Sequence, residues 1–314
     1  MSFSRRRFIA IAAGFALAGK PGSAAPLNGA RWRGVALGAE TDLRIVGMPF
    51  TRAEHLIRVA RAEIERLEKQ FSLYRQDSAI VSLNGAGFLR DPSPDMLELL
   101  SLAGSVHEAS EGMFDPTIQP LWKAYAENGG RPTRAVTRRA LERVGWHMVE
   151  VSPALVRLPN GGAMTLNGIA QGFITDKVVA LLKSFGLEHA LVNVGEISAV
   201  GRPAGFEAWP VHLDAAGTSR KTVGLKDRSV ATSGALGTTL DASQSVSHIV
   251  DPRNGKPAPV LWRRMSVMHR SAALADGIST AAVLMEAGQL TTMARQFDGL
   301  SFDAISRNGS SFLL

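Results

Sequence analysis

Apolar residues return every three or four positions in the first third of the chain. Between Leu56 and Phe71 they form one continuous stripe, as on the buried side of a helix. Thr51 and Glu54 precede this stripe with the spacing of a capping box, in which the two side chains satisfy each other's backbone N–H groups. The pattern therefore predicts an amphipathic helix over about 52–70.

A second helix is predicted from Ser93, because Ser93 followed by Pro94 has the residue types of an N-cap and a first helical position. Its apolar run ends before Gly112. Further helices are predicted over 137–144, 172–185, 276–285 and 290–297.

Short runs rich in β-branched and apolar residues predict strands, most of them in the second half of the chain. They lie at 189–194, 211–214, 230–232, 247–250, 265–269 and 302–306. Helices precede strands instead of alternating with them, which indicates an α+β fold. The Gly- and Pro-rich stretches 201–210 and 252–259 are expected to be loops, so 25–314 is predicted to be one domain.

Composition then narrows the chemistry. The chain has 314 residues, of which 45% are hydrophobic and 20% charged, so it is expected to fold around a large core. It contains no cysteine. This excludes disulfides, thiol nucleophiles, iron–sulfur clusters and thiolate zinc sites, so any metal must be held by oxygen or imidazole ligands.

The first 24 residues have the pattern of an export signal. Arg5, Arg6 and Arg7 precede a short apolar run, and small residues follow up to Ala24, where cleavage is expected. The arginine pair before Phe8 resembles a twin-arginine signal, which implies export by the Tat machinery to the periplasm. A Sec signal or an uncleaved anchor is the alternative.

The net charge of +7 depends largely on that segment. Four of the 35 basic residues lie within 1–24 and no acidic residue does, so 31 basic residues remain against 28 acidic ones, a net charge of +3. This balance, without a basic stripe interleaved with aromatic residues, argues against a nucleic-acid partner. The sequence also lacks the Gly-rich dinucleotide motif, the P-loop, the nucleophile elbow and the HExxH zinc motif.

Three short stretches remain as candidates for chemistry. Asp276 and Thr280 would lie on one helix face and could bind a hard cation, although capping by Asp276 with Ser279 in the first turn is the commoner role of such residues. The small-residue turn 165–172 could offer amides to a phosphate or a carbonyl to a metal, or could serve only packing. His248 could act as a general base or simply bond a loop carbonyl.

Taken together and in order, these stretches resemble the ApbE-type FAD:protein FMN transferases over nearly the whole mature chain. The matching segments are Tyr74-Arg75-Gln76-Asp77-Ser78, Phe114-Asp115-Pro116-Thr117, Gly168-Ile169-Ala170-Gln171-Gly172 with Asp176, Val192-Asn193-Val194-Gly195-Glu196, Ala231-Thr232-Ser233-Gly234, Ser247-His248-Ile249-Val250-Asp251-Pro252 and Ala275-Asp276-Gly277-Ile278-Ser279-Thr280.

The resemblance implies a single T-fold-related α+β domain with mixed, mainly antiparallel sheets packed with helices. It implies Mg²⁺-dependent transfer of FMN from FAD to a Thr or Ser hydroxyl of a target protein through a phosphoester bond, with release of AMP. Asp276, Thr280, Ser279 and the Gly168 carbonyl would bind Mg²⁺, and His248 would be the base. The positions expected to contact FAD are Leu37, Tyr74, Met113, Phe114, Asp115, Thr165, Gln171 and Val250.

Three departures from the family pattern accompany the match. Leu37-Gly38-Ala39 replaces the usual Met-Gly-Thr, Thr165 replaces an Asp, and Gln171 replaces a Lys or Glu. The alternatives are a periplasmic FAD-binding protein without turnover and an FAD pyrophosphatase that yields FMN and AMP. The acceptors implied by the resemblance are flavoprotein domains of membrane electron-transfer complexes.

Overall fold

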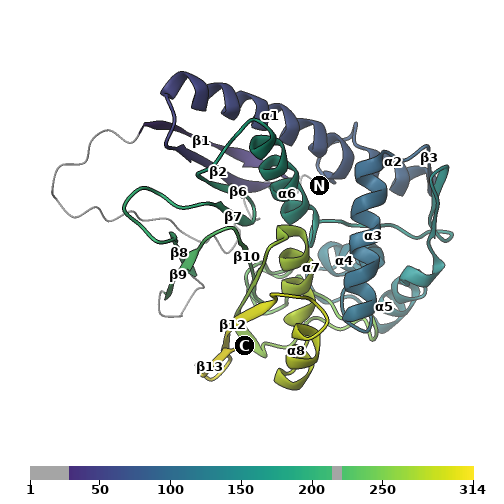
Figure 1. Cartoon of the computed structure of the whole chain (residues 1–314). Helices are drawn as coiled ribbons and strands as arrows, with labels where there is room; N and C mark the ends of the chain where they lie inside the picture. The colour runs from purple at the N-terminus through teal and green to yellow at the C-terminus, as the bar shows by residue number, and fades with distance from the viewer. Residues whose placement is uncertain (1–27, 214–220) are drawn as a thin grey trace.

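The computed structural model describes residues 28–213 and 221–314 (Figure 1). The predicted signal peptide at 1–24, its cleavage site and the twin-arginine motif lie outside the described residues. No described helix is both long and apolar enough to cross a membrane.

One eight-stranded sheet dominates the described fold, with the order β1-β2-β6-β7-β10-β11-β12-β13. Every neighbouring pair in it is antiparallel. Its strands are β1 (Gly29–Ala36), β2 (Ala39–Val46), β6 (Ala190–Val194), β7 (Ile197–Val200), β10 (Ser229–Ser233), β11 (Trp262–His269), β12 (Ser301–Ser306) and β13 (Ser311–Leu313). The first two strands thus join a sheet whose other members come from the second half of the chain.

Two small antiparallel sheets flank the large one. One has the order β3-β5-β4, with β3 at Phe88–Arg90, β4 at Glu150–Val151 and β5 at Leu155–Arg157. The other pairs β8 (Trp209–Leu213) with β9 (Lys221–Leu225).

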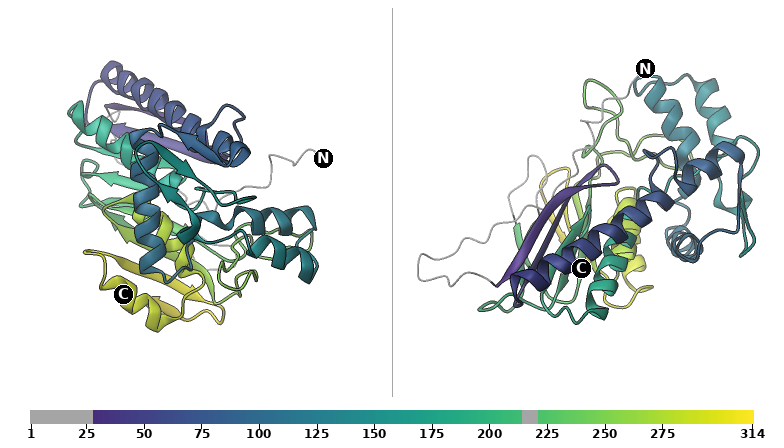
Figure 2. Two further views of the ribbon diagram at one scale, coloured as in Figure 1. Left: turned by 90° about the vertical axis from the view of Figure 1, so that its right-hand side faces the viewer. Right: turned by 90° about the horizontal axis from the view of Figure 1, so that it is seen from above.

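The helices pack on the sheet and on one another (Figures 1 and 2). They are α1 (Phe50–Phe71), α2 (Ala79–Ala86), α3 (Pro94–Ala109), α4 (Gln119–Glu127), α5 (Arg134–Leu141), α6 (Ala170–Ser184), α7 (Ala272–Ala282) and α8 (Ala287–Ala294), with short 3₁₀ turns at Pro116–Ile118 and Trp146–Met148. The helix α1 lies along the β1–β2 hairpin, and α6 contacts both α1 and α7.

The main core lies between these helices and the sheet. Its fully buried members include Leu43 of β2, Ile64 of α1, Phe173 of α6, Val192 of β6 and Ile278 of α7. Burying one such side chain contributes about 1.5–3 kcal/mol. Because α6 and α7 both contribute to this core, the residues at their N-terminal ends are held in fixed positions.

The α+β class is confirmed, and the helix predictions hold with shifted ends. The first helix begins at Phe50 after Pro49, without a side-chain cap, so the predicted capping box at Thr51 and Glu54 is wrong. Ser93 caps α3 as predicted, its side chain accepting the N–H of Met96. The helix predicted at 137–144 is α5, which begins earlier because Thr133 is its cap.

Two local predictions fail in the second half. The helix predicted from 276 begins at Ala272, because Ser271 accepts the N–H of Leu274 and caps it there. Asp276 therefore lies in the middle of a helix and is not its N-cap. The strand predicted at 247–250 is a loop that makes only isolated pairs, Thr239 with Ser247 and Val250 with Pro257.

Candidate active site

Two polar residues of α7, Asp276 and Thr280, contact the start of α6 and the turn before it, and a third, Ser279, contacts β10. Asp276 is 4% exposed, and its carboxylate accepts the N–H of Gly172 at 3.1 Å. The Ser279 hydroxyl is buried and lies 2.7 Å from the hydroxyl of Ser233 on β10. One turn of helix places Thr280 on the same side as Asp276, as their four-residue spacing requires.

The turn before α6 supplies the opposite wall of this site. The Thr280 hydroxyl donates to the Gly168 carbonyl at 3.4 Å. A side chain at Gly168 would meet Thr280 Oγ1 at 3.1 Å and the Phe114 ring at 3.4 Å, so the close approach favours glycine. The residues that the sequence proposes for a cation are therefore brought together by the fold.

Three carboxylates, those of Asp276, Asp176 and Glu196, lie close together at this site. Burial raises the pKa of Asp276 to about 7, and the nearby Asp176 adds to the rise. Burial also raises the pKa of Glu196, which lies in the β6–β7 turn, and the charge of Asp276 raises it further. None of these carboxylates forms an ion pair with a described Lys or Arg, although such pairs occur elsewhere on the molecule. A cation would offset this excess negative charge.

The donors suit a hard cation. No three His, Asp or Glu side chains in the described ranges form a metal-binding group, so a cation held here would need the Gly168 carbonyl and the hydroxyls of Ser279 and Thr280 beside the Asp276 carboxylate. Oxygen donors of these kinds are typical of Mg²⁺ and Ca²⁺ sites.

Asp176 links α6 to α7. Its carboxylate accepts the N–H groups of Ala272 at 2.7 Å and Ala273 at 3.0 Å and the hydroxyl proton of Ser271 at 2.7 Å. A Cβ at Gly172 would lie 2.2 Å from the Ala272 carbonyl oxygen, so the two helices touch through backbone atoms. Asp176 and Glu196 lie in the segments that match the family, but no local pattern in the sequence indicates these contacts.

His248 is half-buried in a loop. Its Nδ1 lies 2.8 Å from the carbonyl oxygen of Thr238, so a neutral ring donates the Nδ1 proton there and leaves Nε2 as the acceptor. No described residue hydrogen-bonds Nε2. Burial lowers the pKa of His248, so the ring is neutral at pH 7. The contact with a loop carbonyl and the base role are thus compatible, because the first fixes the tautomer that the second needs.

The β1–β2 turn consists of Leu37 and Gly38, and Tyr74 approaches it at Gly38. Leu37 and Gly38 have φ values of +48° and +81°, as in a two-residue type I′ hairpin. The Leu37 N–H donates to Glu68 Oε1 at 2.8 Å, and a Cβ at Gly38 would lie 3.3 Å from the Tyr74 ring. Tyr74 is 46% exposed, and a hydrogen bond to Asn167 connects it to the turn that contains Gly168.

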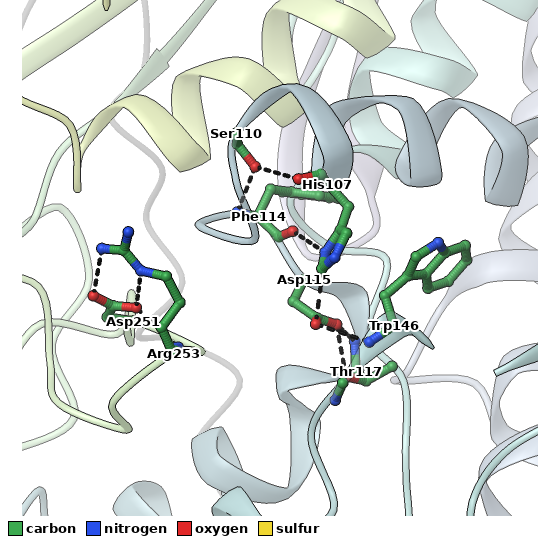
Figure 3. Close-up of polar contacts among 9 residues, drawn as sticks. His107, Ser110, Phe114, Asp115, Thr117, Trp146, Asp251 and Arg253 are labelled. Carbon is green, nitrogen blue, oxygen red and sulfur yellow. Dashed lines mark hydrogen bonds and ion pairs between the residues drawn. The ribbon is translucent and has the colours of Figure 1, made fainter. Parts of the chain in front are cut away.

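The segment Met113–Asp115 follows α3, which ends at Ala109. Figure 3 shows Phe114 and Asp115 of this segment. The Asp115 carboxylate accepts the N–H and the hydroxyl proton of Thr117 at 2.8 and 2.6 Å and the N–H of Trp146 at 3.0 Å. These hydrogen bonds fix the loop around Asp115, and both oxygens of its carboxylate take part in them. Phe114 contacts Gly168, and buried Met113 borders a cavity of about 120 Å³ between α3 and α8.

The remaining predicted FAD positions are distributed around the same turn and loop. The Thr165 hydroxyl accepts the N–H of Asn167 at 3.3 Å. The Gln171 side chain packs against Gly195, where a Cβ would lie 2.5 Å from its Cδ. Val250 is buried in a small core with Leu121 and follows His248 by two residues.

The sequence profile of the ApbE family matches residues 37–302. Curated relatives include the FAD:protein FMN transferase of Treponema pallidum, which is 30% identical over 266 residues, 76% of this chain and 73% of that protein. The FAD:protein FMN transferase of Salmonella typhimurium is 23% identical over 298 residues, 89% of this chain and 85% of that protein.

Solved structures agree with this fold. The flavinyl transferase ApbE of Pseudomonas stutzeri superposes with a TM-score of 0.78 at 25% identity, covering 90% of this chain and 92% of that one. The ApbE protein of Thermotoga maritima gives a TM-score of 0.80 at 25% identity, covering 90% and 96%. The site residues lie within the matched range, and the chain belongs to the ApbE family.

Proposed function

We propose that this chain transfers FMN from FAD to a Thr or Ser hydroxyl of an acceptor protein. The observation that carries the proposal is the buried, un-neutralised carboxylate of Asp276, which shares a site with the Thr280 hydroxyl and the Gly168 carbonyl. The curated relatives named FAD:protein FMN transferase support the same reaction. Tyr74, Phe114 and Leu37 lie around the turn that contains Gly168 and are proposed to hold the flavin.

In the proposed reaction, the acceptor hydroxyl attacks the FMN phosphorus of FAD. A phosphorus–oxygen bond to the acceptor forms, the pyrophosphate bond breaks, and AMP leaves. The unprotonated Nε2 of His248 receives the hydroxyl proton, while Thr238 holds the ring in the required tautomer. Because the nucleophile belongs to the acceptor, the enzyme needs no nucleophilic side chain of its own, which agrees with the absence of cysteine.

Mg²⁺ is the proposed cofactor. Asp276, Thr280, Ser279 and the Gly168 carbonyl would hold it, and when bound it would neutralise charge on the pyrophosphate. Thr165 and Gln171 are neutral where the family usually carries charge, so phosphate contacts here would depend more on the cation than on side-chain charge.

The proposed site of the reaction is the periplasm, and the predicted export signal supports this. Acceptors there would be flavoprotein domains of membrane electron-transfer complexes, and the chain would arrive through the Tat machinery. This part of the proposal depends on the pattern Arg5-Arg6-Arg7-Phe8 and the following apolar run.

The test is to incubate the protein comprising residues 25–314 with FAD, Mg²⁺ and a flavin-acceptor domain, then to measure the mass of the acceptor and the AMP released. We expect one FMN per acceptor and loss of the product with Asp276→Asn. AMP without modified acceptor would instead indicate an FAD pyrophosphatase. FAD that stays bound and intact under every divalent cation would indicate a binding protein without turnover.

A further inference from the structure

A groove of about 430 Å³ lies between α1 and the first strand of the large sheet, outside the site described above. Trp32 and Val35 of β1 line one side of it, and a row of α1 side chains lines the other. Trp32 and Val35 are three residues apart in a strand, so their side chains point to opposite faces. A groove that reaches both must therefore run over the edge of β1.

That edge is free among the described residues. All eight residues of β1 pair with β2 on one side, and β1 is the last strand of the sheet on the other. An unpaired edge presents N–H and C=O groups that an added strand can bind. Val35 is 68% exposed beside it, so apolar surface accompanies the backbone groups.

The groove lining carries charges of both signs, with three arginines against two glutamates. Arg58, Arg61, Glu65 and Glu68 follow one face of α1. Glu65 lies 3.9 Å from Lys69, Glu68 accepts the Leu37 N–H and keeps its charge, and Arg75 is paired with Asp77 at 3.0 Å.

Arg58 and Arg61, the two arginines of this face, differ from the acidic residues in their contacts. Arg61 stacks over the Trp32 ring at 5.2 Å, and neither it nor Arg58 forms an ion pair with a described residue. Arg58 and Arg61 are therefore the groups of this groove that an acidic occupant would bind.

The groove also leads to the flavin site. Strand β1 ends at Ala36, directly before the Leu37–Gly38 turn that touches Tyr74, and Arg75 lines the groove at this end. A strand added along β1 would thus have one end beside the predicted flavin contacts.

We propose that this groove, bounded by β1, α1 and Arg75, docks an extended acidic segment of the acceptor protein by strand addition to β1. An edge strand next to a helix is a known arrangement for peptide recognition of this kind. The occupant would be up to about eight residues long, because β1 has eight residues and a paired strand has about the same rise per residue. This inference rests on the proposed transferase function, since it names the surface that brings the acceptor hydroxyl to the flavin.

The first experiment measures flavinylation kinetics of the acceptor domain used above with the double variant Arg58→Glu and Arg61→Glu. We expect KM for the acceptor to rise about tenfold or more, because reversed charges repel an acidic segment, with KM for FAD unchanged. The matched control is Arg263→Glu with Arg307→Glu, which reverses two exposed arginines near the opposite edge of the same sheet and should leave both constants unchanged.

The second experiment follows backbone hydrogen exchange with an acceptor domain whose target Thr is replaced by Val. We expect the amides of 29–36 to exchange more slowly when the domain is present, while those of 311–313 in β13 do not change. Unchanged exchange in β1, or an acceptor KM that the double variant leaves as in the wild type, would overturn the docking inference. Wild-type protein that modifies no acceptor would instead contradict the proposed function on which it rests.

Discussion

Leu37 has a backbone conformation that a leucine seldom adopts, and one carboxylate holds it there. Its φ of +48° is in the left-handed region, where residues other than glycine carry strain. The bond from its N–H to Glu68 Oε1 compensates by satisfying the donor in the turn. Glu68 thus positions the turn against Tyr74 without being in the predicted FAD contact set.

Replacing Glu68 with Leu should therefore raise KM for FAD about three- to tenfold with little change in kcat, since losing this part-buried hydrogen bond costs about 1 kcal/mol. Glu68→Gln keeps the acceptor oxygen and should restore KM to near the wild-type value. Steady-state kinetics with FAD varied would check this. Equal effects of Gln and Leu would show that the charge, and not the bond to Leu37, matters.

His248→Asn should lower kcat by about 10²–10⁴-fold while FAD still binds, because a general base contributes about this much. His55→Asn, on the exposed surface of α1, is the matched control and should be as active as the wild type.

The same histidine predicts a pH dependence. Burial lowers the pKa of His248, so the base is unprotonated above about pH 6.5, and the rate should fall only below that value. Single-turnover rates between pH 5 and 8 measure it. A rate that keeps rising above pH 7.5 would contradict His248 as the base.

Among single residues, the candidate site residues can be predicted from the sequence, but the residues that hydrogen-bond and position the site cannot. Asp276, Thr280 and His248 stand out by residue type and spacing. Thr238, Asn167 and Asp176 act through a carbonyl or through bonds to residues far away in sequence, which no local pattern reveals. The start of α7 is predicted too late, near Asp276, because Ser271, five residues earlier, caps the helix.

At the scale of elements, the contact between α6 and α7 depends on Gly172. A Cβ there would lie 2.2 Å from the Ala272 carbonyl oxygen, a distance that only movement of a helix can relieve. Gly172→Ala should destabilise the protein by about 1–3 kcal/mol or more and weaken cation binding, since α7 carries Asp276 and Thr280.

Gly85→Ala and Gly288→Ala are the controls for this prediction, because nothing lies within 4 Å of a Cβ at either helical glycine. Both should leave stability unchanged or raise it by up to about 1 kcal/mol. Urea unfolding of the three variants measures the difference. Equal stability of Gly172→Ala and its controls would show that the two helices can separate freely.

Helices and strands are predicted correctly where apolar residues recur over a long stretch of sequence. They are missed where a strand pairs with a segment far away in the sequence. The apolar stripe of α1 and the N-cap of α3 are both predicted correctly from the sequence. The hairpin β1–β2 was missed, because its partner β6 lies some 150 residues later and its exposed face is polar with arginines. The loop at 247–250 has strand-like residues, yet Val250 is buried in a core with Leu121 instead of in a sheet.

At the scale of the whole molecule, Asp276 should make stability depend on pH. Its pKa is about 7 in the folded protein and about 3.9 when unfolded, so folding disfavours the ionised form. The cost is absent below pH 4, grows between pH 4 and 7, and is complete above it.

Asp276→Asn keeps an acceptor for the Gly172 N–H and should raise the melting temperature by several degrees at pH 8, in EDTA, with a smaller effect at pH 5. Added Mg²⁺ should raise the melting temperature of the wild type and not that of the variant. Thermal unfolding at both pH values tests this. A variant that gains equally at pH 5 and pH 8 would show that ionisation of Asp276 carries no folding cost.

The α+β class and the family were readable from the whole sequence, because ordered short segments agree even where single ones are ambiguous. Sheet order was not, since the first two strands complete a sheet built from residues 190 onward. Cysteine content excluded sulfur chemistry but could not show where the oxygen donors meet.

The direct backbone contact between α6 and α7 has a consequence for ion choice. Gly168 immediately precedes α6 and Thr280 belongs to α7, so the 3.4 Å between their oxygens is set by helix packing and not by flexible side chains. Oxygen donors held at a fixed spacing bind a cation of matching radius more tightly than a smaller or larger one. Discrimination between Mg²⁺, with bonds of about 2.1 Å, and Ca²⁺, with bonds of about 2.4 Å, would then be a property of the interface between two helices.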